Sequence, residues 1–98
     1  MVILKIETTI YPNKMIEFEQ ALNHLLPLDK NKKPEYLKGF YQEWQKPNTF
    51  FYIEEWEKEA NLRQHLRSDG FKAFLGAMKV LGDIVNANII FTTHIEEL

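Results

Sequence analysis

The chain is 98 residues long, a length that fits one domain, and its 12 basic and 14 acidic residues leave a net charge of −2. This balance argues against a dedicated nucleic-acid binder, which needs a basic excess to neutralise phosphates. The absence of cysteine excludes disulfide scaffolds, thiolate zinc sites, iron–sulfur clusters and cysteine nucleophiles. The apolar runs are short and no basic-then-apolar leader opens the chain, so we expect a cytoplasmic protein with no membrane partner.

The first 38 residues predict a strand, a helix and a loop. Residues 2–10 are rich in β-branched side chains, and their apolar members share one parity, which is typical of a strand with one buried face. Pro12 ends this strand and Asn13 is a suitable N-cap for the next element. Apolar side chains then recur every three or four positions from Lys14 to Leu26, which predicts an amphipathic helix that Pro27 stops. The polar stretch 27–38 predicts a loop, with a basic cluster at 30–33 and room for a helical turn at 34–37.

Two strands joined by a hairpin are expected next, at residues 39–45 and 49–57. Both are dense in aromatic and β-branched side chains, and residues 46–48 leave room only for a tight turn, with Asn48 suited to a positive φ. A helical region begins at Glu59 and breaks at 68–70, where Ser68 or Asp69 can cap a new start that continues to about Gly82. A final strand is expected at 88–96.

The predicted order of elements, β-α-β-β-α-β, indicates one domain of residues 1–98. A helix after the first and third strands, with a tight hairpin in the middle, is the split βαβ arrangement. We therefore predict an α+β, ferredoxin-like fold in which two helices cover one face of a four-stranded antiparallel sheet.

Aromatic side chains point to a covered second face of this sheet. Two helices cover one face only, yet the strand at 49–57 is apolar on both parities. Eight aromatic residues fall within 21 positions, namely Tyr36, Phe40, Tyr41, Trp44, Phe50, Phe51, Tyr52 and Trp56. An apolar patch of several hundred Å² is rarely left in water. We expect a homodimer that packs sheet face on sheet face, as in a dimeric α/β barrel.

The segment from Phe51 to Phe74 resembles a known family. A strand ending in Glu-x-Trp precedes a helix with His-Leu-x-Ser and a following phenylalanine; the matching residues are Glu54, Trp56, His65, Leu66, Ser68 and Phe71. This pattern is similar to the antibiotic biosynthesis monooxygenase (ABM) family of dimeric α/β barrels. The opening of the first helix, residues 12–14, also resembles the family's Pro-Gly-Lys, with asparagine in place of glycine.

The resemblance implies a ligand pocket between the sheet and the helices. It also implies that no cofactor is needed, because some members oxygenate quinols and anthrone-like compounds with neither metal nor flavin. In that chemistry the anion of an electron-rich phenol reduces dioxygen, while the protein supplies an apolar cavity, hydrogen bonds to the oxyanion and a base. A metal site is not expected either, because the three histidines lie far apart in the sequence.

Three positions depart from the family's patterns. Gly70 stands where the family has a second histidine, so a mechanism that needs that imidazole is unsupported. His65 and Leu75 align with a tryptophan and a haem-ligating histidine of the haem-degrading branch. Haem cleavage by that route is therefore not expected.

His65 is the candidate catalytic residue, because an imidazole can act as a base or a hydrogen-bond donor near neutral pH. Its structural alternative is to close the helix break by bonding a backbone carbonyl or Glu54. The candidates for substrate binding are Trp56, Tyr52, Glu54, Asn61 and Phe71. Each also has a plain structural reading: the aromatic rings can serve as core or interface anchors, Glu54 can be a satisfied buried acid, and Asn61 can be exposed. His24 and His94 are expected at the surface.

We read the sequence as a cofactor-independent monooxygenase acting on an aromatic, quinol-like small molecule, with His65 assisting. The first alternative is a non-catalytic small-ligand-binding or stress-associated dimer on the same scaffold, which Gly70 favours. A further alternative is isomerisation or decarboxylation of a small carbonyl compound, because one fold supports several reactions.

Overall fold

The computed structural model describes residues 1–25 and 36–98, apart from the side chains of residues 24, 25, 36–38 and 40. The elements are β1 (Val2–Ile10), the 3-10 turn η1 (Pro12–Lys14), α1 (Met15–Leu25), β2 (Tyr36–Glu43), β3 (Lys46–Trp56), α2 (Glu59–Leu66), α3 (Asp69–Leu81), β4 (Gly82–Ile90) and β5 (Ile95–Glu97). The part of the predicted loop up to residue 35, which includes its basic cluster, lies outside the described residues. The side chain of His24 also lies outside them.

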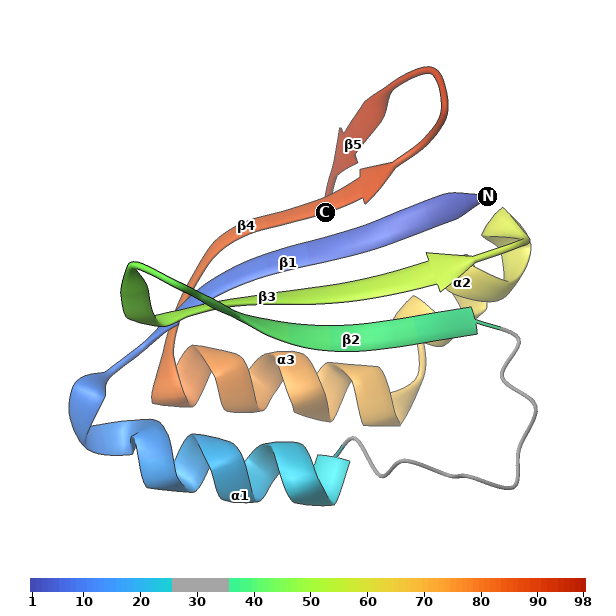
Figure 1. Cartoon of the computed structure of the whole chain (residues 1–98). Helices are drawn as coiled ribbons and strands as arrows, with labels where there is room; N and C mark the ends of the chain where they lie inside the picture. Colours follow the sequence, from blue (N-terminus) through green and yellow to red (C-terminus); the bar gives the residue numbers. More distant parts are fainter. Residues whose placement is uncertain (26–35) are drawn as a thin grey trace.

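All five strands form one antiparallel sheet in the order β2-β3-β1-β4-β5, and α1 and α3 lie side by side below it (Figure 1). The α+β class and the alternation of strands and helices agree with the prediction. The predicted count of four strands and two helices is wrong, because the described residues form five strands and three α-helices.

Two local breaks explain the extra elements. Ser68 caps α3 by accepting a hydrogen bond from Phe71 N at 3.2 Å, so the second helical region is divided into α2 and α3 as its sequence allows. At the C-terminus, the amide of Phe91 donates to the carbonyl of His94 at 2.8 Å and reverses the chain. The single strand predicted at 88–96 is therefore a hairpin, in which β5 pairs with the end of β4.

Several predicted boundaries shift by a few residues. The hairpin turn lies at residues 44–45 instead of 46–48, and Asn48 is not at a positive φ, because β3 already begins at Lys46. Gln42 Nε2 donates to the Pro47 carbonyl at 2.6 Å across this hairpin. Asn13 lies within η1 and does not cap α1, whose first turn continues directly from η1.

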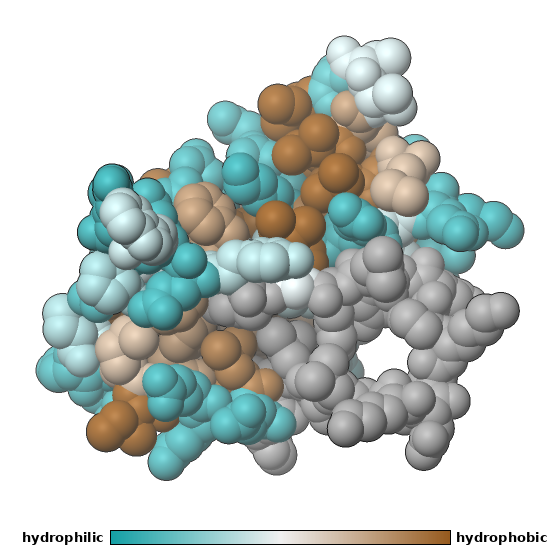
Figure 2. All heavy atoms as spheres, in the orientation of Figure 1, coloured by the Kyte–Doolittle hydropathy of each residue, from teal (hydrophilic) through white to brown (hydrophobic). Residues whose placement is uncertain are grey.

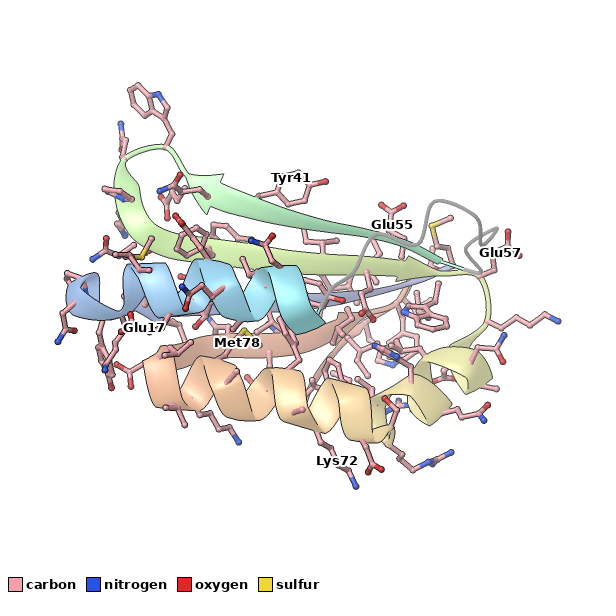
Figure 3. The ribbon with its side chains drawn as sticks, turned by 90° about the horizontal axis from the view of Figure 1, so that it is seen from below. Glu17, Tyr41, Glu55, Glu57, Lys72 and Met78 are labelled. Carbon is pink, nitrogen blue, oxygen red and sulfur yellow. The ribbon has the colours of Figure 1, made fainter. Side chains whose placement is uncertain are left out.

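The core lies between the sheet and the helices. Alternate residues of β1 and β3 face the helices, and one cluster of buried side chains joins them to α2, α3 and β4: Val2, Leu4, Ile6, Tyr52, Trp56, Leu62, Phe71, Phe74, Met78 and Ile89. A smaller cluster joins Phe18 of α1 to Phe50 of β3, with ring centroids 4.9 Å apart. Figure 3 shows Met78 between the two long helices and Lys72 directed outward.

The other face of the sheet carries no helix in the described structure. Its side chains alternate with the core residues, and the half-buried or exposed apolar ones are Ile3, Tyr41, Phe51, Ile53, Ile90 and Ile95. Apolar side chains gather toward β4 and β5, among hydrophilic neighbours (Figure 2). Across the described chain, no helix is both long and apolar enough to span a membrane.

Candidate functional site

Strand β3 presents three of the predicted site residues side by side. Because side chains alternate along a strand, Tyr52, Glu54 and Trp56 all point to the helix-covered face. In the register with β1, Glu54 lies opposite Leu4, so its carboxylate sits in an apolar interior. The side chain of Glu54 is 0% exposed. A charge in such a place needs hydrogen-bond donors around it.

A fourth predicted site residue, His65, comes from the last turn of α2. Leu62 anchors this helix in the core. The hydroxyl of Ser68 then donates to the carbonyl of His65 at 2.7 Å and accepts from the amide of Phe71. Ser68 thus ends α2, begins α3 and fixes the backbone of His65 at the corner between them.

The four side chains form one hydrogen-bonded cluster around the Glu54 carboxylate. Trp56 Nε1 donates to Oε1 at 2.9 Å, and the Tyr52 hydroxyl donates to Oε2. His65 Nε2 lies 3.0 Å from the same Oε2. Each carboxylate oxygen therefore has at least one neighbouring donor, which is how a buried acid is stabilised.

These contacts decide the charge of Glu54. Burial by itself raises the pKa of this carboxyl, whereas the hydrogen bonds from His65, Tyr52 and Trp56 lower it. The outcome is a pKa below the ordinary value of 4.5, so Glu54 is a buried carboxylate anion at neutral pH. It makes an ion pair with His65 whenever that imidazole is protonated.

Aromatic rings enclose the imidazole of His65. The ring of Trp56 lies 5.2 Å from it and the ring of Phe71 lies 5.1 Å from it, measured between centroids. The His65 side chain is 23% exposed, whereas Trp56 and Phe71 are buried. His65 is thus the member of the cluster with the most contact with solvent, and it connects the surface to the buried carboxylate.

The structure brings five of the six predicted site residues together. Asn61 lies on α2 and is half-buried, and within the described part of the chain no hydrogen bond joins it to the cluster. His94 is exposed, as expected, and stacks on Phe91 with ring centroids 4.4 Å apart. Tyr41 and Trp44 are 57% and 87% exposed, so in this chain alone they do not line the interior.

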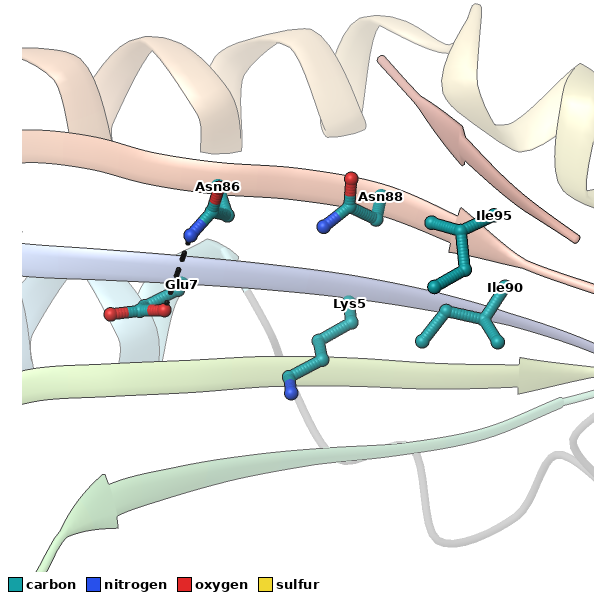
Figure 4. A pocket seen from close by; sticks show the side chains of 6 residues that line it. All are labelled: Lys5, Glu7, Asn86, Asn88, Ile90 and Ile95. Atoms are coloured by element: carbon teal, nitrogen blue, oxygen red, sulfur yellow. Dashed lines mark hydrogen bonds between the residues drawn. The ribbon is translucent and has the colours of Figure 1, made fainter.

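A shallow hollow lies on the opposite, open face of the sheet. It is lined by Lys5, Glu7, Asn86, Asn88, Ile90 and Ile95, from β1, β4 and the start of β5 (Figure 4). Asn86 Nδ2 donates to the Glu7 carboxylate at 3.4 Å, and Lys5 Nζ lies 5.1 Å from the ring centre of Phe51. On the helix-covered side, buried side chains pack around Glu54.

A second ionic contact, which the sequence analysis missed, holds the corner that carries His65. Arg63 of α2 donates from both terminal nitrogens to the carboxylate of Glu96 on β5, at 2.6 and 2.9 Å. The hydrogen bonds to Glu96, and a weaker one to Glu59, raise the pKa of Arg63 above its ordinary value. Because 33 positions separate Arg63 from Glu96, spacing along the sequence gave no signal for this contact.

Comparisons with known proteins agree with this fold. The family model for antibiotic biosynthesis monooxygenase matches residues 1–77, which include the whole Glu54 cluster. No curated protein matches the chain significantly. Among solved structures, a conserved protein from Methanosarcina mazei Go1 is 26% identical, with a TM-score of 0.73 over 98% of this chain and 90% of that one.

Two further solved structures share the fold at lower identity. An antibiotic biosynthesis monooxygenase is 16% identical, with a TM-score of 0.73 over 100% of this chain and 98% of that one. SnoaB, a cofactor-independent oxygenase from Streptomyces nogalater, is 18% identical, with a TM-score of 0.73 over 95% of this chain and 93% of that one. With most of its length matched by the family model, the chain belongs to the antibiotic biosynthesis monooxygenase family.

Proposed function

We propose that this protein is a cofactor-independent monooxygenase that acts on an aromatic, quinol-like small molecule beside His65. The observation that carries the proposal is the contact between a fully buried carboxylate, Glu54, and an imidazole that reaches the surface. A buried anion stabilises an imidazolium, so the pair can take up a proton from a phenolic substrate. Membership of a monooxygenase family supports the same reaction class.

In this reaction the substrate supplies the electrons. His65 takes the acidic proton, from a hydroxyl of a quinol or from the methylene of an anthrone, and the electron pair of the broken bond remains on the substrate, whose anion then reduces dioxygen. For an anthrone, one oxygen atom replaces the two hydrogens of the reacting methylene as a carbonyl, and the other oxygen leaves with them as water. The atoms and electrons of anthrone plus O₂ therefore balance with those of anthraquinone plus water, and no further reductant is required.

The proposed binding region is the space between the sheet and the helix corner. The rings of Trp56 and Phe71 flank His65 there and offer apolar surfaces to a flat ligand. Asn61 is proposed to contact a substrate oxygen from the neighbouring part of α2. Since the described side chains pack around this corner, entry of a substrate requires some of them to move.

Oxygen consumption with a panel of hydroquinones and anthrones tests the proposal. We expect uptake by the wild type that falls about 10²-fold or more in His65→Ala, with equal uptake in the matched surface variant His94→Ala. Absence of uptake with every compound would contradict the proposed reaction. Unchanged uptake in His65→Ala would remove this residue from the mechanism.

A second candidate function is a non-catalytic ligand-binding protein on the same scaffold. Two observations favour it: glycine occupies position 70, and side chains such as Tyr52 and Phe71 are already buried around the cluster. The ligand-binding function would be favoured if a quinol binds, as measured by quenching of tryptophan fluorescence, and no oxygen is taken up.

We further propose that two copies pair through their open sheet faces. Half-buried Phe51 and Ile53 and exposed Tyr41 lie on that face, and a second copy would remove their apolar surface from water. Light scattering at micromolar concentration should give a dimer for the wild type and a monomer for Phe51→Glu. The matched control is Val80→Glu, an exposed position on α3, which should stay dimeric. A monomeric wild type would refute the pairing.

A further inference from the structure

The two oxygens of Glu54 differ in what surrounds them. Oε1 faces the indole nitrogen of Trp56, which carries a hydrogen and can only donate, so Oε1 is an acceptor. Oε2 faces both the Tyr52 hydroxyl and Nε2 of His65. The hydrogen bonds to Glu54 lower its pKa, so the group is ionised at neutral pH and Oε2 also accepts.

A neutral imidazole carries one hydrogen, and its position follows from this geometry. Nε2 lies 3.0 Å from an oxygen that can only accept, so the hydrogen must be on Nε2 for an attractive contact. The lone pair of the neutral ring is then on Nδ1. Resting on the function proposed above, we propose that Glu54 is a positioning residue that holds His65 as the Nε2–H tautomer, so that Nδ1 is the nitrogen that accepts the substrate proton.

The surroundings of His65 keep the ring in this orientation. Trp56 and Phe71 pack near it at 5.2 and 5.1 Å, and Ser68 binds the carbonyl of the same residue. Rotation of the ring would break the contact with Glu54 and displace these neighbours. When a substrate hydroxyl gives its proton to Nδ1, the electron pair of the O–H bond stays on the substrate oxygen, and the new imidazolium faces the buried negative charge of Glu54.

Nitrogen-15 NMR of the wild type tests the tautomer without any substrate. The His65 signals are assigned by their loss in His65→Gln, and the spectrum is recorded at a pH high enough for the ring to hold one proton. We expect a pyrrole-like shift at Nε2 and a pyridine-like shift at Nδ1. The reverse assignment, or an equal mixture of the two tautomers, would overturn the proposal.

Variants then separate positioning from general structure. Glu54→Gln removes the charge at nearly constant volume, and its side-chain amide can donate to Nε2 as well as accept from it. We expect a mixed tautomer and a fall in His65-dependent oxygen uptake of about 10²-fold, in the range that acid–base assistance contributes. Glu57→Gln, just after β3 and exposed, is the matched control and should change neither readout.

Tyr52→Phe is a second variant that leaves the contact between Glu54 and His65 in place. It should keep the Nε2–H tautomer, and it provides a test should Glu54→Gln not fold. Retention of the wild-type tautomer and rate in Glu54→Gln would contradict the positioning role. The expected tautomer without oxygen uptake would refute only the proposed reaction, whereas uptake that depends on His65 in the other tautomer would refute only this inference.

Discussion

The indole of Trp56 donates a 2.9 Å hydrogen bond to the carboxylate of Glu54, two positions earlier on the same strand. Both side chains are buried, so the loss of this donor leaves part of a buried charge unsatisfied. We expect Trp56→Phe to lower the free energy of unfolding by about 1–3 kcal/mol, measured by urea denaturation. Trp44→Phe is the control: this tryptophan is exposed, and its replacement should cost less than about 0.5 kcal/mol. Equal effects would show that the hydrogen bond contributes nothing.

The lowered pKa of Glu54 makes stability depend on pH with a defined sign. Because the pKa in the folded state is below 4.5, the anion favours folding above that pH, and the contribution is lost as pH falls through the folded value. We expect Glu54→Gln to be less stable than the wild type at neutral pH, with a difference in Tm that shrinks in acid below about pH 4.5. A difference in Tm that stays constant across this range would contradict the assignment.

Substitution by alanine is expected to have opposite effects on stability at two glycines, Gly82 and Gly76. A Cβ on Gly82, at the start of β4, would lie 2.1 Å from the Thr9 carbonyl oxygen and 2.8 Å from Ile10 Cα, so backbone must move. Gly76, within α3, has open space at the corresponding point. We expect Gly82→Ala to destabilise by about 1–3 kcal/mol and Gly76→Ala to stabilise by about 0.5–1 kcal/mol in thermal or urea unfolding. An unchanged free energy of unfolding in Gly82→Ala would contradict the close approach between position 82 and the backbone of β1.

The pair of Arg63 and Glu96 should control the opening of β5. The short strand is also held by backbone bonds, such as that from the Leu98 amide to the Ala87 carbonyl at 2.9 Å. In Arg63→Met we expect faster hydrogen exchange at the Leu98 amide, because the tie between α2 and β5 is lost. Arg67→Met, an exposed position after α2, should leave that exchange rate unchanged. Unchanged exchange in Arg63→Met would mean that backbone pairing alone holds β5.

Periodicity was sufficient to predict the elements whose burial pattern is regular. The alternation in β1 predicted its bounds, because one face of that strand is buried along its whole length. Ser68 signalled the break between α2 and α3 because its hydroxyl can cap a helix. The end of the chain was harder to interpret: β4 includes exposed polar residues such as Asn86, so alternation did not extend back to Gly82.

The candidate site was predicted only in part, for a similar reason. Alternation placed Tyr52, Glu54 and Trp56 on one face of β3, and the break after His65 suggested a bond to Glu54 as one alternative. Which donor meets which carboxylate oxygen depends on tertiary packing, which spacing does not encode. The same applies to the hollow at Lys5 and Asn88, whose residues lie on strands adjacent in space but distant in sequence.

The Glu54 cluster joins residues that are close in sequence, whereas the ion pair between Arg63 of α2 and Glu96 of β5 joins residues that are distant in sequence. Two positions separate Glu54 from Tyr52 and from Trp56, and 11 separate it from His65. Closing such a short loop costs little entropy, so these bonds can form once the corner after β3 folds. During synthesis, the nascent chain can assemble its charged cluster while β4 and β5 are still inside the ribosome. The contact between Arg63 and Glu96 can form only after β5 has been added.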